Sequence, residues 1–131
     1  MEQISVLLAD DYKPILDTAT RLLAHEFDVV GTAHDGQAAL EMAEFLEPDV
    51  LVTDISMPRM SGIEVVRQLA RANSTVKVVL LTVHENSDYV RESLAAGALG
   101  YVVKSRMAAD LVDAIKAAHA GRSFVSDFTS S

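Results

Sequence analysis

The amino-acid sequence predicts an α/β fold, with a single doubly wound, five-stranded parallel sheet and five helices. Short β-branched, apolar runs alternate along the 131 residues with segments whose apolar residues recur at the helical period. Several runs are apolar almost throughout, as in residues 78–81, which is typical of strands buried on both faces of a parallel sheet. Half of the residues are hydrophobic and 23% are charged, a composition that indicates a globular domain.

Five segments carry the strand pattern. They span residues 4–9, Asp28–Ala33, Val50–Thr53, Lys77–Thr82 and Gly100–Val103. Strands that alternate with helices are joined by right-handed crossovers, which place helices on both faces of the sheet. In such sheets ligands bind beyond the carboxyl ends of the strands, so the residues that follow each strand are the first candidates for a site.

Three helices are predicted in the first half of the chain from their starting signals. The first begins near Pro14, since proline in the first turn costs no hydrogen bond. The second follows Asp35, whose side chain is suited to an N-cap. The third begins at Ser61 with Glu64 three residues later, which is the capping-box pattern.

Two more helices and a tail complete the chain. The fourth helix spans Ser87–Ala96 and is ended by Gly97, and the fifth precedes Gly121. Beyond Gly121 the periodic pattern stops. We therefore expect residues 1–121 to form the domain, and residues 122–131 to be a C-terminal tail or the start of a linker to an effector domain.

Charge and composition exclude several classes of function. A formal net charge of −8 argues against direct binding of nucleic acid by this domain. The sequence has no cysteine, which excludes disulfides, thiolate metal sites and cysteine nucleophiles. No signal-peptide pattern is present, and no apolar run approaches the roughly 20 residues of a membrane helix. We expect a cytoplasmic protein without a membrane partner.

Polar residues follow the strands at one predicted edge of the sheet. Asp10 and Asp11 follow the first strand, Asp54 follows the third, Thr82 ends the fourth, and Lys104 follows the fifth. Alone, each has an ordinary explanation as a solvated turn, a strand residue or a surface charge. Together, clustered carboxylates repel one another and need a compensating cation, and Mg²⁺ prefers such oxygen ligands.

This set of side chains is suited to phosphoryl transfer, which depends mainly on positioning and charge neutralisation. The carboxylate of Asp54 can act as a nucleophile and form an acyl phosphate, while Lys104 and Thr82 contact phosphoryl oxygens. No glycine-rich phosphate loop precedes a lysine, so the phosphoryl group is expected to come from another molecule rather than from bound ATP.

These motifs resemble the receiver domain of two-component response regulators. Residues 54–62, Asp-Ile-Ser-Met-Pro-Arg-Met-Ser-Gly, are similar to the phosphoacceptor loop of that family. The Asp10-Asp11 pair, Leu81-Thr82 and residues 96–104 match the family in order and spacing. The resemblance extends from residue 4 to about residue 121 and implies a flavodoxin-like sheet with the strand order 2-1-3-4-5.

The resemblance implies a role for each residue around the metal. Asp54 would be phosphorylated by a sensor histidine kinase. Asp11 and Asp54 would ligate Mg²⁺ by their side chains, Asp10 mostly through water, and Ser56 through its main-chain carbonyl. The domain would not be an enzyme in the usual sense, because it would catalyse only its own phosphorylation and dephosphorylation.

The resemblance also implies a switch. Thr82 and Lys104 would contact the phosphoryl group, and Tyr101 stands where the family often has an aromatic residue that turns inward when the threonine moves. On spacing alone, an ordinary half-buried strand aromatic explains Tyr101 equally well. Ser56 and His84, two residues beyond Asp54 and Thr82, are expected to tune the lifetime of the phosphoryl group, although a solvated loop histidine is the simpler interpretation of His84.

The chain departs from many receiver domains at Ser105, where they have proline. The sequence leaves open whether the Lys104–Ser105 peptide is cis or trans, and whether Ser105 caps the last helix. This feature, with the residues after Gly121, looks most like receivers attached to helix-turn-helix DNA-binding domains of the LuxR/FixJ/NarL type. DNA contact is therefore expected only through such an effector domain, with a homodimer on phosphorylation as a further possibility.

Two other classes of function fit the sequence less well. An aspartyl-phosphate phosphatase of the haloacid-dehalogenase type carries its nucleophile after the first strand and a second aspartate two residues later. Here the nucleophile follows the third strand, and Ser56 occupies that second position. A pseudo-receiver, an interaction module that is never phosphorylated, is disfavoured because every chemical position is filled.

Overall fold

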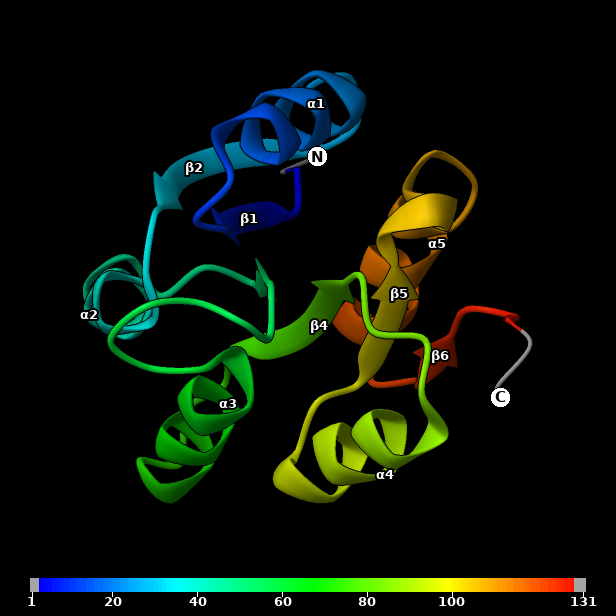
Figure 1. Ribbon diagram of the computed structural model, residues 1–131. Coiled ribbons are helices and arrows are strands. Elements are labelled where there is room, and N and C mark those ends of the chain that lie inside the picture. The colour runs from blue at the N-terminus through cyan, green and yellow to red at the C-terminus, as the bar shows by residue number, and fades with distance from the viewer. Residues whose placement is uncertain (1–2, 129–131) are drawn as a thin grey trace.

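A parallel sheet lies between two layers of helices in the computed structural model, which describes residues 3–128 (Figure 1). The strands are β1 (Ser5–Ala9), β2 (Asp28–Ala33), β3 (Val50–Thr53), β4 (Lys77–Thr82), β5 (Gly100–Val103) and β6 (Phe124–Val125). The helices are α1 (Lys13–Leu23), α2 (Gly36–Leu46), α3 (Gly62–Arg71), α4 (Ser87–Ala96) and α5 (Met107–His119), with a short 3₁₀ helix η1 (Lys104–Arg106) before α5. The strand order is β2-β1-β3-β4-β5-β6, so the predicted order 2-1-3-4-5 is confirmed for the first five strands.

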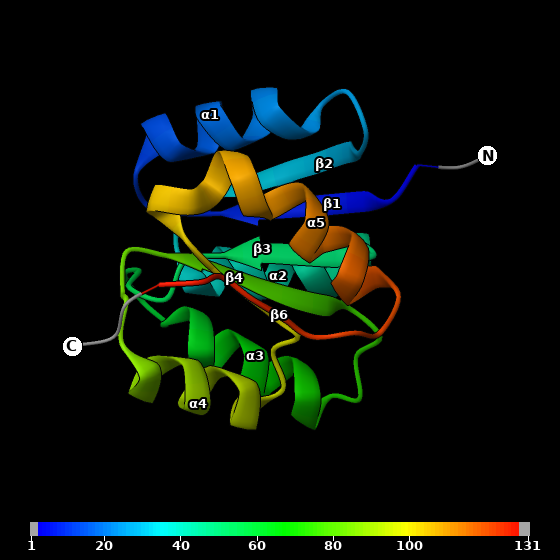
Figure 2. The ribbon, with the colours of Figure 1, turned by 90° about the vertical axis from the view of Figure 1, so that its right-hand side faces the viewer.

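The two faces of the sheet are covered by different helices. Figure 1 shows α1 and α5 on one side of the sheet and α2, α3 and α4 on the other, and Figure 2 shows α1 at the opposite end of the molecule from α3 and α4. Successive strand residues point to opposite faces, so Leu8 packs on the side of Leu111 from α5, while Leu7 packs on the side of Ile63 from α3. Each fully buried leucine of this kind contributes about 1.5–3 kcal/mol relative to an exposed one. Between residues 3 and 128, no helix has the length and apolar character needed to cross a membrane.

The helix starts follow the capping signals of the sequence. The Oδ1 of Asp35 accepts a hydrogen bond from the Ala38 N–H at 2.8 Å, and the Oγ of Ser61 accepts one from the Glu64 N–H at 3.1 Å. The predicted capping box is only half present, because the Glu64 carboxylate accepts from Gln68 at 2.9 Å instead of turning back. Helix α4 ends at Gly97, whose φ of 123° disfavours any residue with a side chain.

The predicted sheet was one strand short. The tail expected over residues 122–131 contains β6, which pairs in parallel with β5, and residues 129–131 lie outside the described part of the chain. The Oγ of Ser126 donates to Asp110 at 2.7 Å and lies 3.3 Å from the Val103 N–H, from which it accepts. A two-residue strand has too little sequence pattern to be predicted, and this one depends on a side chain from α5.

An ion pair between Arg106 and Asp110 supports the attachment of the segment after α5. Arg106 donates to both carboxylate oxygens of Asp110, from Nε at 2.8 Å and from Nη2 at 3.2 Å. The hydrogen bond from Arg106, assisted by that from Ser126, lowers the pKa of Asp110 below its ordinary value, although burial opposes the shift. The carboxylate of Asp110 therefore connects η1, α5 and the segment after α5.

We expect Asp110→Asn to lower the free energy of unfolding at pH 7 by about 1 kcal/mol, because the buried bond from Ser126 loses its charged acceptor while Arg106 is half-exposed and screened. The pKa of Asp110 is lower in the folded chain than the value of about 3.9 expected when unfolded. Its contribution is thus complete above that value and is lost as the pH falls through the folded pKa.

Urea unfolding of the wild type and the variant between pH 7 and pH 3 measures this effect. The difference in free energy of unfolding between the two proteins should become smaller as the pH falls. Asp113→Asn, an exposed position on the same helix, is the matched control and should leave stability nearly unchanged. A gap for Asp110→Asn that stays constant over this range would contradict the assignment.

Candidate functional site

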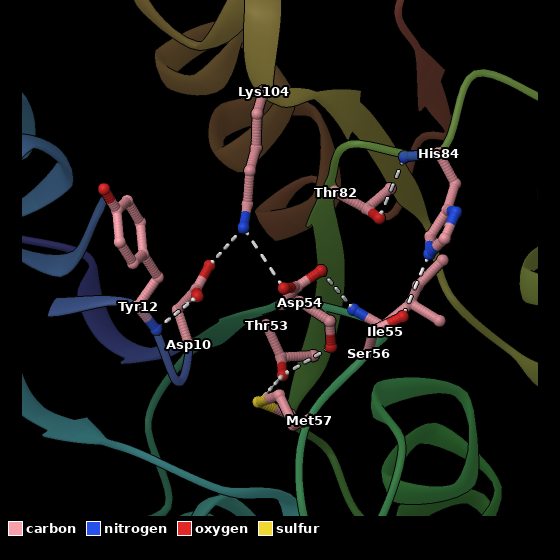
Figure 3. Close-up of polar contacts among 10 residues, drawn as sticks. All are labelled: Asp10, Tyr12, Thr53, Asp54, Ile55, Ser56, Met57, Thr82, His84 and Lys104. Atoms are coloured by element: carbon pink, nitrogen blue, oxygen red, sulfur yellow. Dashed lines mark hydrogen bonds and ion pairs between the residues drawn. The ribbon is translucent and has the colours of Figure 1, made fainter. Parts of the chain in front are cut away.

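The carboxyl ends of β1, β3 and β5 bring charged residues together at one edge of the sheet (Figure 3). The main chain fixes the first two: the Asp10 N–H donates to the Ala33 carbonyl at 3.1 Å, and the Asp54 N–H donates to the Ala9 carbonyl at 3.0 Å. Both aspartates thus begin where a parallel ladder ends. This is the place at which open α/β sheets bind ligands, because the strand order reverses there.

Three carboxylates form the acidic part of this site. One oxygen each from Asp10, Asp11 and Asp54 lies within 4.8 Å of the others. Asp10 and Asp54 are buried, with exposed fractions of 2% and 6%, while Asp11 is exposed. Like charges this close repel one another and favour either proton uptake or a bound cation.

Lys104 supplies the compensating charge within the chain. Its Nζ lies 2.7 Å from Oδ2 of Asp10 and 3.1 Å from Oδ2 of Asp54, as the dashed lines in Figure 3 show. Burial by itself lowers the pKa of Lys104, but the two carboxylates outweigh it and raise that pKa above its ordinary value. Burial raises the pKa of Asp10, with help from the charge of Asp54 and against the bonds from Lys104 and the Tyr12 N–H.

The same site is suited to a hard cation. Oδ2 of Asp10 is buried, and the one cation within ion-pair distance of it among residues 3–128 is Lys104. The remaining lone pairs of this oxygen can therefore accept a second cation. Three carboxylate oxygens around one point match the ligands of Mg²⁺, so Asp10, Asp11 and Asp54 fit that ion.

The loop after Asp54 is fixed by two close backbone contacts. The Gly62 N–H donates to the Ile55 carbonyl at 2.8 Å, and a Cβ at position 62 would stand 1.9 Å from the carbonyl oxygen of Asp54. From the other side, the Gly36 N–H donates to the Pro58 carbonyl at 3.2 Å, and a Cβ there would stand 1.8 Å from the carbonyl oxygen of Met60. The sequence pattern did not reveal this contact of Gly36.

The carboxylate of Asp54 is itself oriented. Its Oδ1 accepts a hydrogen bond from the Ile55 N–H at 2.7 Å, while Oδ2 faces Lys104. Ser56, expected to offer its carbonyl to a metal, lies on the same loop. Its side chain turns the other way, and its Oγ is 2.9 Å from Nε2 of His84. The sequence indicated both residues as neighbours of the site, but not that they touch.

The loop after β4 joins Thr82, His84 and Tyr101. The fully buried hydroxyl of Thr82 accepts a hydrogen bond from the His84 N–H at 3.2 Å. The hydroxyl of Tyr101 donates to the His84 carbonyl at 2.7 Å. The ring of Tyr101 is fully buried rather than half-buried, and this burial raises the pKa of Tyr101 to about 12.

His84 is more ordered than a solvated loop histidine. Its side chain is bonded to Ser56 and its ring stacks on Tyr89, with the ring centroids 4.4 Å apart. The His84 ring is half-exposed and contacts two other segments, so it is a solvated loop histidine only in part.

Ser105 has a different contact from the one considered. No cis peptide occurs in the described part of the chain, so the Lys104–Ser105 peptide is trans. Helix α5 starts after Arg106 without a side-chain cap. The Ser105 hydroxyl instead donates to Glu85 at 3.4 Å, which links η1 to the loop after β4. Ser105 therefore does not cap the last helix.

Comparison with known proteins gives consistent matches. Residues 6–116 match the family model for the response regulator receiver domain. The chain is 35% identical over 125 residues to the transcriptional regulatory protein DegU of Brevibacillus brevis, covering 94% of this chain and 53% of DegU. The chain spans about half the length of the curated relatives it matches.

Solved structures show the same fold. A two-component response regulator of the LuxR family from Aurantimonas sp. SI85-9A1 superposes with a TM-score of 0.88 at 31% identity, covering 94% of this chain and 89% of that one. The isolated REC domain of RcsB from Salmonella enterica serovar Typhimurium, solved in the presence of the phosphomimetic BeF₃⁻, superposes with a TM-score of 0.86 at 27% identity, covering 96% and 95%.

Proposed function

Because this chain belongs to the response regulator receiver domain family, we propose that it is the phosphoryl-accepting switch of a two-component system, with Asp54 as the acceptor. The observation that carries the proposal is the position of the Asp54 carboxylate, buried between two further aspartates and the ammonium of Lys104. The family is one of signalling domains, so the reaction is a regulatory modification of the protein itself.

The donor is a phosphohistidine of a sensor histidine kinase. A carboxylate oxygen of Asp54 attacks the phosphorus, the P–N bond breaks, and the histidine nitrogen leaves with the bonding pair and takes up a proton. The hydrogen bond from the Ile55 N–H orients the carboxylate before attack. Asp11, Asp54 and the main-chain carbonyl of Ser56 would hold Mg²⁺, with Asp10 mostly through water, and the ion would supply positive charge for the phosphoryl oxygens.

Lys104 and Thr82 act on the product. The ammonium of Lys104 already faces Oδ2 of Asp54, so it can pair with a phosphoryl oxygen attached at that side chain. The hydroxyl of Thr82 donates no hydrogen bond to a described residue, which leaves its proton available for another phosphoryl oxygen. When Thr82 moves toward the phosphoryl group, the loop that carries His84 moves with it. Tyr101 moves with this loop, because its hydroxyl donates to the His84 carbonyl.

The output lies outside the domain. Because the transcriptional regulatory protein DegU is about twice as long as this chain, the chain is proposed to control a DNA-binding helix-turn-helix domain and so transcription. Phosphorylation would change a partner surface or favour a homodimer.

Incubation with acetyl phosphate and Mg²⁺, followed by intact-mass measurement, tests the acceptor directly. The wild type should gain one phosphoryl group, and Asp54→Asn should gain none, because its amide is not a nucleophile. The exposed Asp28→Asn is the matched control and should label like the wild type. Equal labelling of wild type and Asp54→Asn would refute the assignment.

The bonded pair of Ser56 and His84 is proposed to shield the acyl phosphate from water, since it bridges the loops after β3 and β4. We expect the double change Ser56→Ala, His84→Ala to speed dephosphorylation about fivefold, equivalent to a barrier lower by about 1 kcal/mol. Phosphoryl half-life, followed by phosphate-affinity gel, measures it.

His25→Ala, which removes an exposed histidine from the loop before β2, is the control and should leave the half-life within about twofold. If the double variant keeps the wild-type half-life, the pair has no shielding role.

A further inference from the structure

The outer edge of β5 binds the chain's own C-terminal segment, residues 122–128, which is named the clasp here. Figure 1 places β6 beside β5, at the side of the sheet farthest from β2. No pattern in the sequence predicted this attachment. None of the groups assigned to phosphoryl transfer belongs to the clasp.

Three hydrogen bonds attach the clasp on either side of Tyr101. The Phe124 N–H donates to the Leu99 carbonyl at 2.9 Å, and the Ser126 N–H donates to the Tyr101 carbonyl at 2.8 Å. The Val103 N–H donates to the Ser126 hydroxyl at 3.3 Å. The clasp therefore follows β5 through the residue that the phosphoryl switch would move.

Two aromatic side chains of the clasp enter different halves of the core. Phe124 packs with the residues between the sheet and α1 and α5. Phe128 packs with the opposite half, which contains Tyr101, and the centroids of these two rings are 6.5 Å apart at 35°. Tyr101 has no exposed surface in this arrangement. Phe128 is thus part of what encloses the inward ring.

A chain of contacts joins the clasp to the candidate site. The Tyr101 hydroxyl bonds to the His84 carbonyl, and the His84 N–H bonds to Thr82. The His84 ring also bonds to Ser56, two residues after Asp54. A change at Asp54 that draws Thr82 inward would therefore stabilise the arrangement in which Tyr101 is enclosed.

We propose that the clasp is a phosphorylation-sensitive closure: it docks on β5 while Tyr101 is inward, and it loosens when the ring turns outward into the space that Phe128 occupies. This inference rests on the proposed function, because the phosphoryl group at Asp54 is what biases Tyr101. In this proposal the outward Tyr101 ring and the docked Phe128 compete for the same space, so the state of the site sets the fraction of closed clasp. The direction in which the chain leaves the domain then depends on the phosphoryl group.

Closure of the clasp and binding of a phosphoryl mimic at Asp54 are thermodynamically linked. If a phosphoryl mimic at Asp54 tightens the clasp by some factor, a closed clasp must tighten binding of that mimic by the same factor. Removing Phe128 therefore affects a site to which it makes no direct polar contact. A clasp that is only a static part of the fold would not show this reciprocity.

Amide hydrogen exchange measured by NMR tests it, with the protein before and after addition of beryllofluoride and Mg²⁺. In the wild type, exchange of the Phe124 and Ser126 amides should slow at least fivefold, because both donate to β5. Filling of the site is read separately from the Ile55 amide shift, since that N–H bonds to Asp54.

Phe128→Ala should speed exchange of both clasp amides at least fivefold. It should also raise the dissociation constant of beryllofluoride, by the factor by which beryllofluoride slows clasp exchange in the wild type. Val125→Ala, at a 40% exposed position of the same strand, is the control and should change neither. The Val52 amide in the central strand should keep its protection in both variants, which separates local loosening from unfolding.

Each outcome decides a different claim. A shifted Ile55 amide with unchanged clasp exchange would overturn the clasp and leave the proposed function standing. An unshifted Ile55 amide would overturn the proposed function and the dependence of the clasp on it. Weakened beryllofluoride binding in Val125→Ala as large as in Phe128→Ala would also contradict the closure.

Discussion

The ammonium of Lys104, held between Asp10 and Asp54, is the interaction on which the rest of this site depends. Unit charges 4.8 Å apart repel by about 3 kcal/mol at an effective dielectric constant of about 20, so three carboxylates at one sheet edge need a counter-ion. Lys104 reaches them because the order of the strands brings the end of β5 to the same edge as β1 and β3. The fold therefore holds three carboxylates beside Lys104 in an arrangement that can also bind a metal ion.

From that charge cluster, a series of hydrogen bonds leads to the segment after α5. The loops after β3 and β4 meet at Ser56 and His84. The His84 carbonyl accepts from the hydroxyl of the buried Tyr101, and the Tyr101 carbonyl accepts from the Ser126 N–H. We propose that a charge change at Asp54 is transmitted along these contacts to the segment after α5.

Most of the fold could be predicted because its signals are local. Apolar runs marked the first five strands, and Asp35 and Ser61 capped helices where the pattern placed them. Strand β6 could not, since it has only two residues, and the side-chain bond beside it joins Ser126 to Asp110 in a different element.

The candidate site likewise has contacts that the sequence could predict and contacts that it could not. The residues that the topology must bring together, such as Asp10, Asp54 and Lys104, followed from their positions after the strands. The contact of His84 with Ser56, 28 positions away, depends on loop conformations that no periodicity encodes. The full burial of Tyr101 likewise depends on Phe128, beyond the part of the chain where the sequence pattern could be interpreted.

The stability of Lys104→Met, measured by urea unfolding with and without Mg²⁺, tests the charge balance most directly. Without Mg²⁺ the variant should lose about 3 kcal/mol, because two buried carboxylates lose their counter-ion, and excess Mg²⁺ should restore more stability to it than to the wild type. Lys116→Met, which removes an exposed pair with Glu26, should change little. A Lys104→Met protein as stable as the wild type without Mg²⁺, or stabilised by the ion to the same extent, would contradict the account.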